Sequence, residues 1–369
     1  MSVPNTSTFS FSDVATEIYG SVSAGQNLAQ CFADASGAFD PTWSGAKNSL
    51  LNFRNYSHIS MNILFVAIPA VSSPNPYIRT SFIGSSYTTQ TALPLTDIGL
   101  REIRIARSNK NYMIASYNSA SAVPIAYYSS NAGVSWNAVG ISNSYMFGSA
   151  ISDNGAAMIQ VRSNSSYALY YSYNYGSSWT TKTTGLGSSQ QLRSPSCNSS
   201  GSFVWVGNLS SAVNYYSINS CSTFTTVTTP FIVNSTCMHS DGSKVWIASS
   251  TTPTIAYTTN KSSFTTINLS PSNSSVTYIA CSSSGQYILV TNNFTMWVSN
   301  NYGSSFTTLS DLGLTDPSSL SVSSSGKYMS ISTRTTAGAA FTSYDYGVSW
   351  ISTTFSGMST RISGSAVGE

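Results

Sequence analysis

The sequence predicts an all-β fold: a seven-bladed β-propeller in which the C-terminal strand closes the first blade, preceded by a small, mainly helical or irregular N-terminal segment. Three observations lead to this prediction. A turn motif recurs seven times along the 369 residues, at intervals of about 44 residues. A second turn, in most copies containing glycine, lies upstream of the copies, and short apolar runs flank both turns. Two turns joining four strands in each unit are typical of a propeller blade.

The recurring turn keeps the same residue types in most copies. A clear copy reads Tyr171-Ser-Tyr-Asn174-Tyr-Gly176-Ser-Ser178-Trp179. Asn and Asp side chains accept hydrogen bonds from nearby backbone N–H groups, glycine supplies a positive φ, and the aromatic ring suits burial against a neighbouring sheet. We therefore expect a structural turn between the third and fourth strands of each blade. Its residues are Asn131, Gly133, Trp136, Asn174, Gly176, Trp179, Asn219, Asn260, Asn301, Gly303, Asp345, Gly347 and Trp350, and the first copy, near Phe82, is degenerate.

The upstream turn, for example Asp153-Asn-Gly155, is expected to join the first two strands of a blade. The two ends of the chain complete this scheme. Residues 361–367 read as an innermost strand with no turn after it, and residues 63–68 read as a second strand with no first strand before it. The C-terminal strand should therefore pair with the strand at residues 63–68, which leaves fewer free sheet edges.

These turns resemble the Asp-box, or BNR, repeat of sialidases and related propellers. The resemblance covers residues 59 to 369 and implies structural turns rather than catalysis. Asn stands where the family has Asp in most copies, which is a departure from its pattern.

Composition excludes several classes of protein. Only 7% of residues are charged, and 15 Lys and Arg against 12 Asp and Glu give a net charge of +3. With 41% hydrophobic and 12% aromatic residues the chain can build a large core, which excludes disorder caused by polarity. The near-neutral balance argues against nucleic acid or an anionic membrane as a partner.

No apolar run is long enough for a membrane helix, and the N-terminus lacks the pattern of a secretory signal, so we expect no membrane insertion. The five cysteines are widely spaced and contain no CxxC pair, which predicts buried free thiols and no metal site. Nothing indicates a cofactor. A hydroxyl-rich surface without an export signal fits a virion protein made in the host cytoplasm.

Residues 1–57 lie outside the repeat, which we place at residues 58–369. Residues 10–13 can form a capping box, and residues 28–35 can form a second helix. The segment is similar, in residues 11–14, 31–35 and 39–56, to the N-terminal attachment modules of tailed-bacteriophage virion proteins. That resemblance implies docking on another virion protein, through the large apolar side chains Phe32, Phe39, Trp43, Leu50, Leu51, Phe53 and Tyr56.

Strand direction sorts the connections onto two faces. The recurring turns share one face, which we expect to be bland, and the longer loops share the opposite face, where function on a rigid scaffold usually sits. We also expect Arg104 and Arg107 to lie near the central channel. The candidate ligand-binding residues of the loop face are Asp97, Arg101, Tyr145, Arg162, Arg193, Asp316 and Arg334.

The function expected from these features is that of a structural or receptor-binding protein of a phage particle. The N-terminal segment would dock on the virion, and the propeller would face outward and bind a host surface glycan. A homo-oligomer is expected, with a trimer as one option. One alternative is a glycoside hydrolase, sialidase-like or capsule-degrading, although the repeat contains few carboxylates that are not in turns. Another is an assembly factor that holds a protein partner.

Overall fold

The structure is a computed structural model, and it describes residues 10–19, 27–28, 31, 49–53, 64–69, 79–81, 88–89, 100–117, 126–140, 146–162, 168–187, 191–271, 274–309, 316–333, 339–354 and 362–368. The chain divides into two units, Met1–Ile63 and Leu64–Glu369. The sequence predicted this division after residue 57. Each unit is described separately below.

The described part of the N-terminal unit contains helix α1 (Phe11–Tyr19) and a short 3-10 helix, η1 (Leu50–Phe53). The capping box expected at residues 10–13 is present. The backbone N–H of Ser10 donates to the Asp13 carboxylate at 2.5 Å, and the backbone N–H of Asp13 donates to the hydroxyl of Ser10 at 3.4 Å. The helix predicted at residues 28–35 lies mostly outside the described residues.

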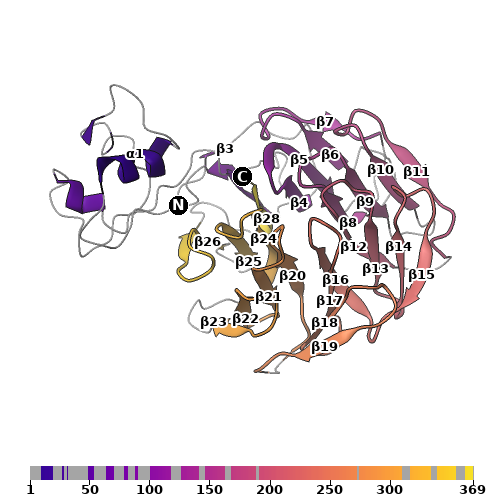
Figure 1. Cartoon of the computed structure of the whole chain (residues 1–369). Helices are drawn as coiled ribbons and strands as arrows, with labels where there is room; N and C mark the ends of the chain where they lie inside the picture. Colours follow the sequence, from indigo (N-terminus) through magenta and orange to yellow (C-terminus); the bar gives the residue numbers. More distant parts are fainter. Residues whose placement is uncertain are drawn as a thin grey trace. The chain divides into compact units, whose positions relative to one another are not determined.

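The second unit is an all-β propeller, as predicted. Its described residues form seven four-stranded antiparallel sheets (Figure 1). In chain order the strands are β1 (Leu64–Pro69), β2 (Arg79–Ser81), β3 (Thr88–Thr89), β4 (Leu100–Ala106), β5 (Asn109–Tyr117), β6 (Ala126–Ser129), β7 (Asn137–Ala138), β8 (Met146–Ile151), β9 (Met158–Arg162), β10 (Ala168–Ser172), β11 (Thr180–Lys182), β12 (Leu192–Cys197), β13 (Val204–Asn208), β14 (Val213–Ser217), β15 (Thr225–Thr228), β16 (Val233–Met238), β17 (Val245–Ser249), β18 (Thr254–Thr258), β19 (Thr265–Asn268), β20 (Tyr278–Cys281), β21 (Ile288–Thr291), β22 (Met296–Ser299), β23 (Thr307–Leu309), β24 (Pro317–Val322), β25 (Met329–Thr333), β26 (Ala339–Ser343), β27 (Ile351–Thr354) and β28 (Ile362–Gly368).

Six sheets are built from four consecutive strands, and the remaining sheet has the order β28-β1-β2-β3. In that sheet Phe65 of β1 lies opposite Val367 of β28, so the C-terminal strand pairs with the first strand as the sequence predicted. The innermost strands contact one another in the cyclic order β4, β8, β12, β16, β20, β24, β28 and back to β4. These contacts close a ring around a central channel, about which the sheets fan out in Figure 1.

Burial follows the position of a strand within its sheet. The second strands are packed between neighbouring sheets, and β13 and β17 are buried at every position. Their sequences, Val-Trp-Val-Gly-Asn and Val-Trp-Ile-Ala-Ser, accordingly read as nearly continuous apolar runs. The fourth strands, such as β15 and β19, are short, threonine-rich and mostly exposed. Short polar edge strands reduce pairing with other chains.

The recurring turns join the third and fourth strands of their sheets. In one of them, the Asn174 side-chain oxygen accepts the backbone N–H of Ser178 at 2.9 Å, and the Trp179 indole N–H donates to the carbonyl of Gly176 at 2.9 Å. Tyr175 and Gly176 have φ values of 59° and 86°. The backbone N–H of Tyr175 donates to the carbonyl of Ala156 in the upstream turn, so both kinds of turn share one face.

This turn face is not bland, and the sequence expectation for it was wrong. Six of the eight large hydrophobic side chains that are exposed among the described residues lie in the recurring turns. Five of them are next to the turn glycine, and Ile218 precedes Asn219 in the copy where Cys221 replaces the glycine. The six are Val134, Tyr175, Ile218, Tyr302, Tyr346 and Val348.

Candidate functional site

A buried ion pair lies in the central channel near the turn face. The Arg107 side chain, which follows β4, donates from Nε to the Asp153 carboxylate at 2.7 Å. Its Nη1 also donates to the carbonyls of Met238 at 3.3 Å and Cys281 at 3.1 Å, on β16 and β20. Asp153 accepts further hydrogen bonds from the hydroxyls of Ser240 and Ser283. One guanidinium therefore bridges sheets on different sides of the channel.

Burial by itself would lower the pKa of Arg107, because a charged group loses its hydration. The negative charge of Asp153 acts in the opposite direction, and the pKa of Arg107 is raised overall. Arg107 is therefore a fixed cation that neutralises a buried carboxylate. Its hydrogen bonds join several sheets at the turn end of the channel.

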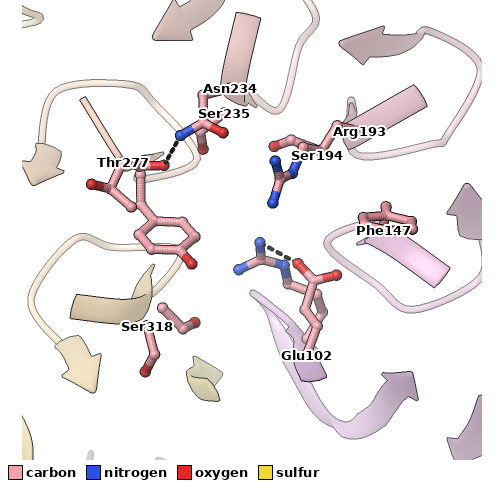
Figure 2. Close-up of a pocket in the computed structure, with 11 residues that line it drawn as sticks. Glu102, Phe147, Arg193, Ser194, Asn234, Ser235, Thr277 and Ser318 are labelled. Carbon is pink, nitrogen blue, oxygen red and sulfur yellow. Dashed lines mark hydrogen bonds and ion pairs between the residues drawn. The ribbon is translucent and has the colours of Figure 1, made fainter. Parts of the chain in front are cut away.

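At the loop end the channel opens into a polar cavity of about 160 Å³, which we call the mouth cavity (Figure 2). Its lining comes almost entirely from the innermost strands, so several sheets contribute one or two residues each. The lining residues are Glu102, Arg104, Phe147, Arg193, Ser194, Asn234, Ser235, Thr277, Tyr278, Ser318 and Ser319.

Irregular pairing of the innermost strands explains why these side chains reach the cavity. The pairing of β8, β12, β16 and β24 with the next strand shifts register near its loop end. A β-bulge inserts a residue and redirects its side chain. The residues within these four irregularities include Phe147, Ser194, Asn234 and Ser318, and all four line the mouth cavity.

The charged groups of the mouth cavity are not equivalent. Arg104 forms an ion pair with Glu102 at 2.6 Å and also donates to the carbonyl of Leu320 at 3.4 Å. The guanidinium of Arg193 makes no hydrogen bond or ion pair with the described residues, and Figure 2 shows it directed into the cavity. The side-chain amide of Asn234 donates to the carbonyl of Thr277 at 3.0 Å, which holds part of the wall in place. Arg193 is thus the cation available to a ligand.

A second cavity of about 110 Å³ lies deeper in the channel. Arg104 lines both cavities, which places them next to each other. The deeper cavity, which we call the thiol cavity, is also lined by Arg107 and by Cys197, Cys237 and Cys281. All five cysteines of the chain are buried and free.

Of the predicted ligand-binding residues, the described structure places only Arg193 in the mouth cavity. The Arg162 Nη1 donates to the Tyr170 hydroxyl at 3.0 Å, and Arg162 is not among the lining residues of the mouth cavity. Asp316 directly precedes β24 with a φ of 50°, and it is also outside the lining. Arg101 belongs to β4 but its side chain is not described, and Asp97, Tyr145 and Arg334 lie outside the described residues.

Of the predicted docking residues, Phe53 is fully buried within the chain. This corrects its assignment as a docking side chain, because a completely buried ring cannot contact a partner directly. Leu50 is half-buried, and Leu51 is described only as part of η1. Phe32, Phe39, Trp43 and Tyr56 lie outside the described residues.

Sequence reasoning missed most of the mouth cavity, because it looked for charged residues in long loops. Phe147, Arg193, Asn234 and Tyr278 lie instead near the beginning of successive innermost strands. Aligning the repeat copies on their innermost strands would have brought these positions together. The proximity of Arg104 and Arg107 to the channel was predicted, and both line the thiol cavity.

Within the described ranges, no group of three or more His, Cys, Asp or Glu residues is arranged to hold a metal ion. No helix among the residues that the structure describes is long and apolar enough to cross a membrane.

No family model matches the chain, and no curated protein matches it. Many solved structures share its fold. One is YCF48 bound to D1 peptide, with 13% sequence identity and a TM-score of 0.51 over 78% of this chain and 86% of that chain. Another is the nidogen/laminin complex, with 10% identity and a TM-score of 0.51 over 73% of this chain and 99% of that chain. At these identities the similarity shows the fold alone.

Proposed function

We propose that this protein is a non-catalytic propeller that binds a partner at the mouth cavity. The observation that carries this proposal is the guanidinium of Arg193, which faces the cavity without a partner among the described residues. Ligand sites in folds with a central channel combine a concave surface with a few converging polar groups, and the mouth cavity has both.

The lining favours a polar ligand that carries an acidic group. A guanidinium offers a planar set of donors that matches a carboxylate, and such a pair is stronger than a hydrogen bond between neutral groups. The hydroxyls of Ser194, Ser235 and Ser319 supply neutral polar partners around it, while Phe147 and Tyr278 supply apolar ring surface. An acidic sugar presents the matching features, with hydroxyls, an apolar ring face and a carboxylate.

The same lining argues for binding rather than hydrolysis. Most glycoside hydrolases use two carboxylates on either side of the bond that is cleaved. Among the described lining residues Glu102 is the one carboxylate, and Arg104 holds it in an ion pair at 2.6 Å. We therefore propose that the cavity binds a glycan without cleaving it.

The biological setting that we propose is a bacteriophage particle. The N-terminal unit would dock on another virion protein, and the propeller would face outward to a glycan of the host surface. The hydroxyl-rich, weakly charged composition and the similarity of residues 1–57 to phage attachment modules support this proposal.

A protein partner is the second candidate. The two structural neighbours described above were solved with a peptide or as a protein complex. An acidic peptide would use the same guanidinium of Arg193, so the two candidates differ in the ligand and not in the site.

Binding of the full chain to arrays of neutral and acidic glycans, and to immobilised acidic peptides, tests the proposal. We expect saturable binding to an acidic glycan, no cleavage product, and a loss of about tenfold or more in affinity for Arg193→Gln. Arg162→Gln is the matched control and should bind normally. Binding that Arg193→Gln leaves intact would refute the proposed site, binding to peptides alone would favour the second candidate, and cleavage of the glycan would overturn the non-catalytic assignment.

A further inference from the structure

We propose that Cys237 and Cys281 form a peroxide-reactive dithiol in the channel, which closes to a disulfide between the innermost strands β16 and β20. This inference is independent of the ligand proposed for the mouth cavity. It concerns a covalent modification of two residues that the binding function does not use.

The two thiols are neighbours in the ring of innermost strands. Cys237 is the penultimate residue of β16, and Cys281 is the last residue of β20. These two strands contact each other, and both cysteines line the thiol cavity. The thiol of Cys281 donates to the carbonyl of Met238, the residue that follows Cys237, at 3.5 Å. The Cys281 sulfur therefore lies beside the backbone of β16 next to Cys237.

A cation lies beside the pair. Arg107 donates to the backbone carbonyls of Cys281 at 3.1 Å and of Met238, next to Cys237, at 3.3 Å, and its charge is fixed by the ion pair with Asp153. A nearby guanidinium favours the thiolate form of a cysteine, and the thiolate is the nucleophile.

The surroundings distinguish the two sulfurs. The neighbouring Cys237 thiol lowers the pKa of Cys281 against the effect of burial, and the positive charge of Arg107 acts in the same direction. Burial raises the pKa of Cys237 and the neighbouring Cys281 raises it further, which outweighs the lowering by Arg107 and Arg104. Cys281 is thus suited to attack, and Cys237 is suited to remain protonated until it resolves the intermediate.

A small oxidant can reach the pair through the channel. The thiol cavity of about 110 Å³ is large enough for water-sized molecules, and it adjoins the mouth cavity at Arg104. Hydrogen peroxide is small enough for a cavity of this volume.

The reaction balances with hydrogen peroxide as the oxidant. The Cys281 thiolate attacks one peroxide oxygen, the O–O bond breaks, and Cys281 becomes a sulfenic acid while hydroxide leaves. The Cys237 sulfur then attacks the sulfenic sulfur, a disulfide forms, and the sulfenic oxygen leaves as water with the Cys237 proton. Two thiols lose two electrons and the peroxide is reduced to two molecules of water. A chain made in a reducing cytoplasm and then exposed to an oxidising exterior would undergo this closure once.

The test uses the purified, reduced full chain treated with hydrogen peroxide and then alkylated without reduction. We expect peptide mapping by mass spectrometry to find the Cys237 and Cys281 peptides linked and lighter by two hydrogen atoms. Cys281→Ser should slow the peroxide-driven loss of thiols by about tenfold or more, because it removes the favoured nucleophile. Cys237→Ser should react at Cys281 but give sulfenic or sulfinic acid instead of a disulfide.

Cys197→Ser is the matched control, because Cys197 is buried in the same cavity on β12 and should not be needed for the linkage. Circular dichroism of each reduced variant shows whether it is folded before oxidation. Two results in the folded wild type would overturn the proposal. One is oxidation of Cys237 and Cys281 without a bond between them, and the other is a disulfide between either of them and Cys197.

Discussion

Arg107 and Asp153 lie in different sheets, 46 positions apart in the chain, and their side chains meet at 2.7 Å at the turn end of the channel. Both side chains are largely buried: that of Arg107 is 16% exposed and that of Asp153 is 10% exposed. A charge buried to this degree depends on its partner, since the desolvation of each ion is offset mainly by the other. This ion pair is therefore a point at which the fold can be weakened selectively.

Asp153→Asn should destabilise the propeller strongly. It leaves the guanidinium of Arg107 buried without a counter-charge, and removal of one partner of a buried pair typically costs about 3–5 kcal/mol. Urea unfolding measures the change in the free energy of unfolding. Asp241→Asn is the control, because Asp241 lies exposed in the corresponding turn of another sheet, and it should change stability by less than about 1 kcal/mol.

The double variant Arg107→Met with Asp153→Asn should recover part of that loss, because it removes the uncompensated charge. Stability of the double variant equal to or below that of Asp153→Asn would show that Arg107 acts through its other hydrogen bonds and not through its charge.

Much of the fold could be predicted from the sequence because the repeat is carried by local chemistry. Each of these hydrogen bonds in the turn of Asn174 joins residues no more than four positions apart, so the signal of the turn is present in a short stretch of sequence. The pairing of β28 with β1 could be predicted by counting strands. In the sequence, the first blade lacked an innermost strand, and the C-terminal strand lacked the other strands of a blade.

The mouth cavity could not be predicted in the same way. Phe147, Ser194 and Asn234 reach it through β-bulges, and nothing in their sequence contexts marks a bulge. The ion pair of Arg107 with Asp153 joins residues that the sequence assigned to a channel and to a turn, and only the closed ring brings them together. Contacts across the ring depend on the geometry of all the sheets, whereas the turns do not.

The recurring turns should tolerate exchange of Asn and Asp but not loss of the side-chain oxygen. Asn174→Ala removes the acceptor of the Ser178 N–H, and we expect a loss of about 1 kcal/mol in the free energy of unfolding. Asp345→Asn should change it by less than about 0.5 kcal/mol, because Asn makes the equivalent bond at the other turns. Urea unfolding of both variants measures the difference, and equal losses would contradict this account of the turn.

Two turn glycines should respond differently to the same substitution. Gly176 and Gly133 have φ values of 86° and 80°, so alanine at either site adds about 1 kcal/mol of backbone strain. A Cβ at position 176 would lie 2.5 Å from the Tyr128 ring, whereas at position 133 its nearest neighbour is the sulfur of Met113 at 3.4 Å. We therefore expect Gly176→Ala to cost about 1–3 kcal/mol more than Gly133→Ala in urea unfolding. Similar losses would mean that the Tyr128 ring moves aside freely.

The buried imidazole of His239 should make the propeller sensitive to acid. Burial, followed by the positive charge of Lys244, lowers the pKa of His239 from 6.5 to about 4, and its Nε2 accepts the Trp246 indole N–H at 3.3 Å. The unfolded chain therefore binds a proton at a higher pH than the folded chain does. The stabilisation is complete above pH 6.5 and is lost as the pH falls toward about 4, by up to about 3 kcal/mol.

His239→Gln isolates this contribution, because glutamine keeps an acceptor for Trp246 but does not titrate. The variant is expected to be less stable than the wild type at neutral pH, since the imidazole also packs beneath Gly285 of the next sheet. The informative quantity is the difference in the free energy of unfolding between the two proteins as a function of pH. That difference should shrink between pH 6.5 and about 4, where only the wild type loses the stabilisation of a neutral imidazole. A constant difference across this range would show that His239 titrates alike in the folded and unfolded chains, and the acid sensitivity would then belong to the carboxylates.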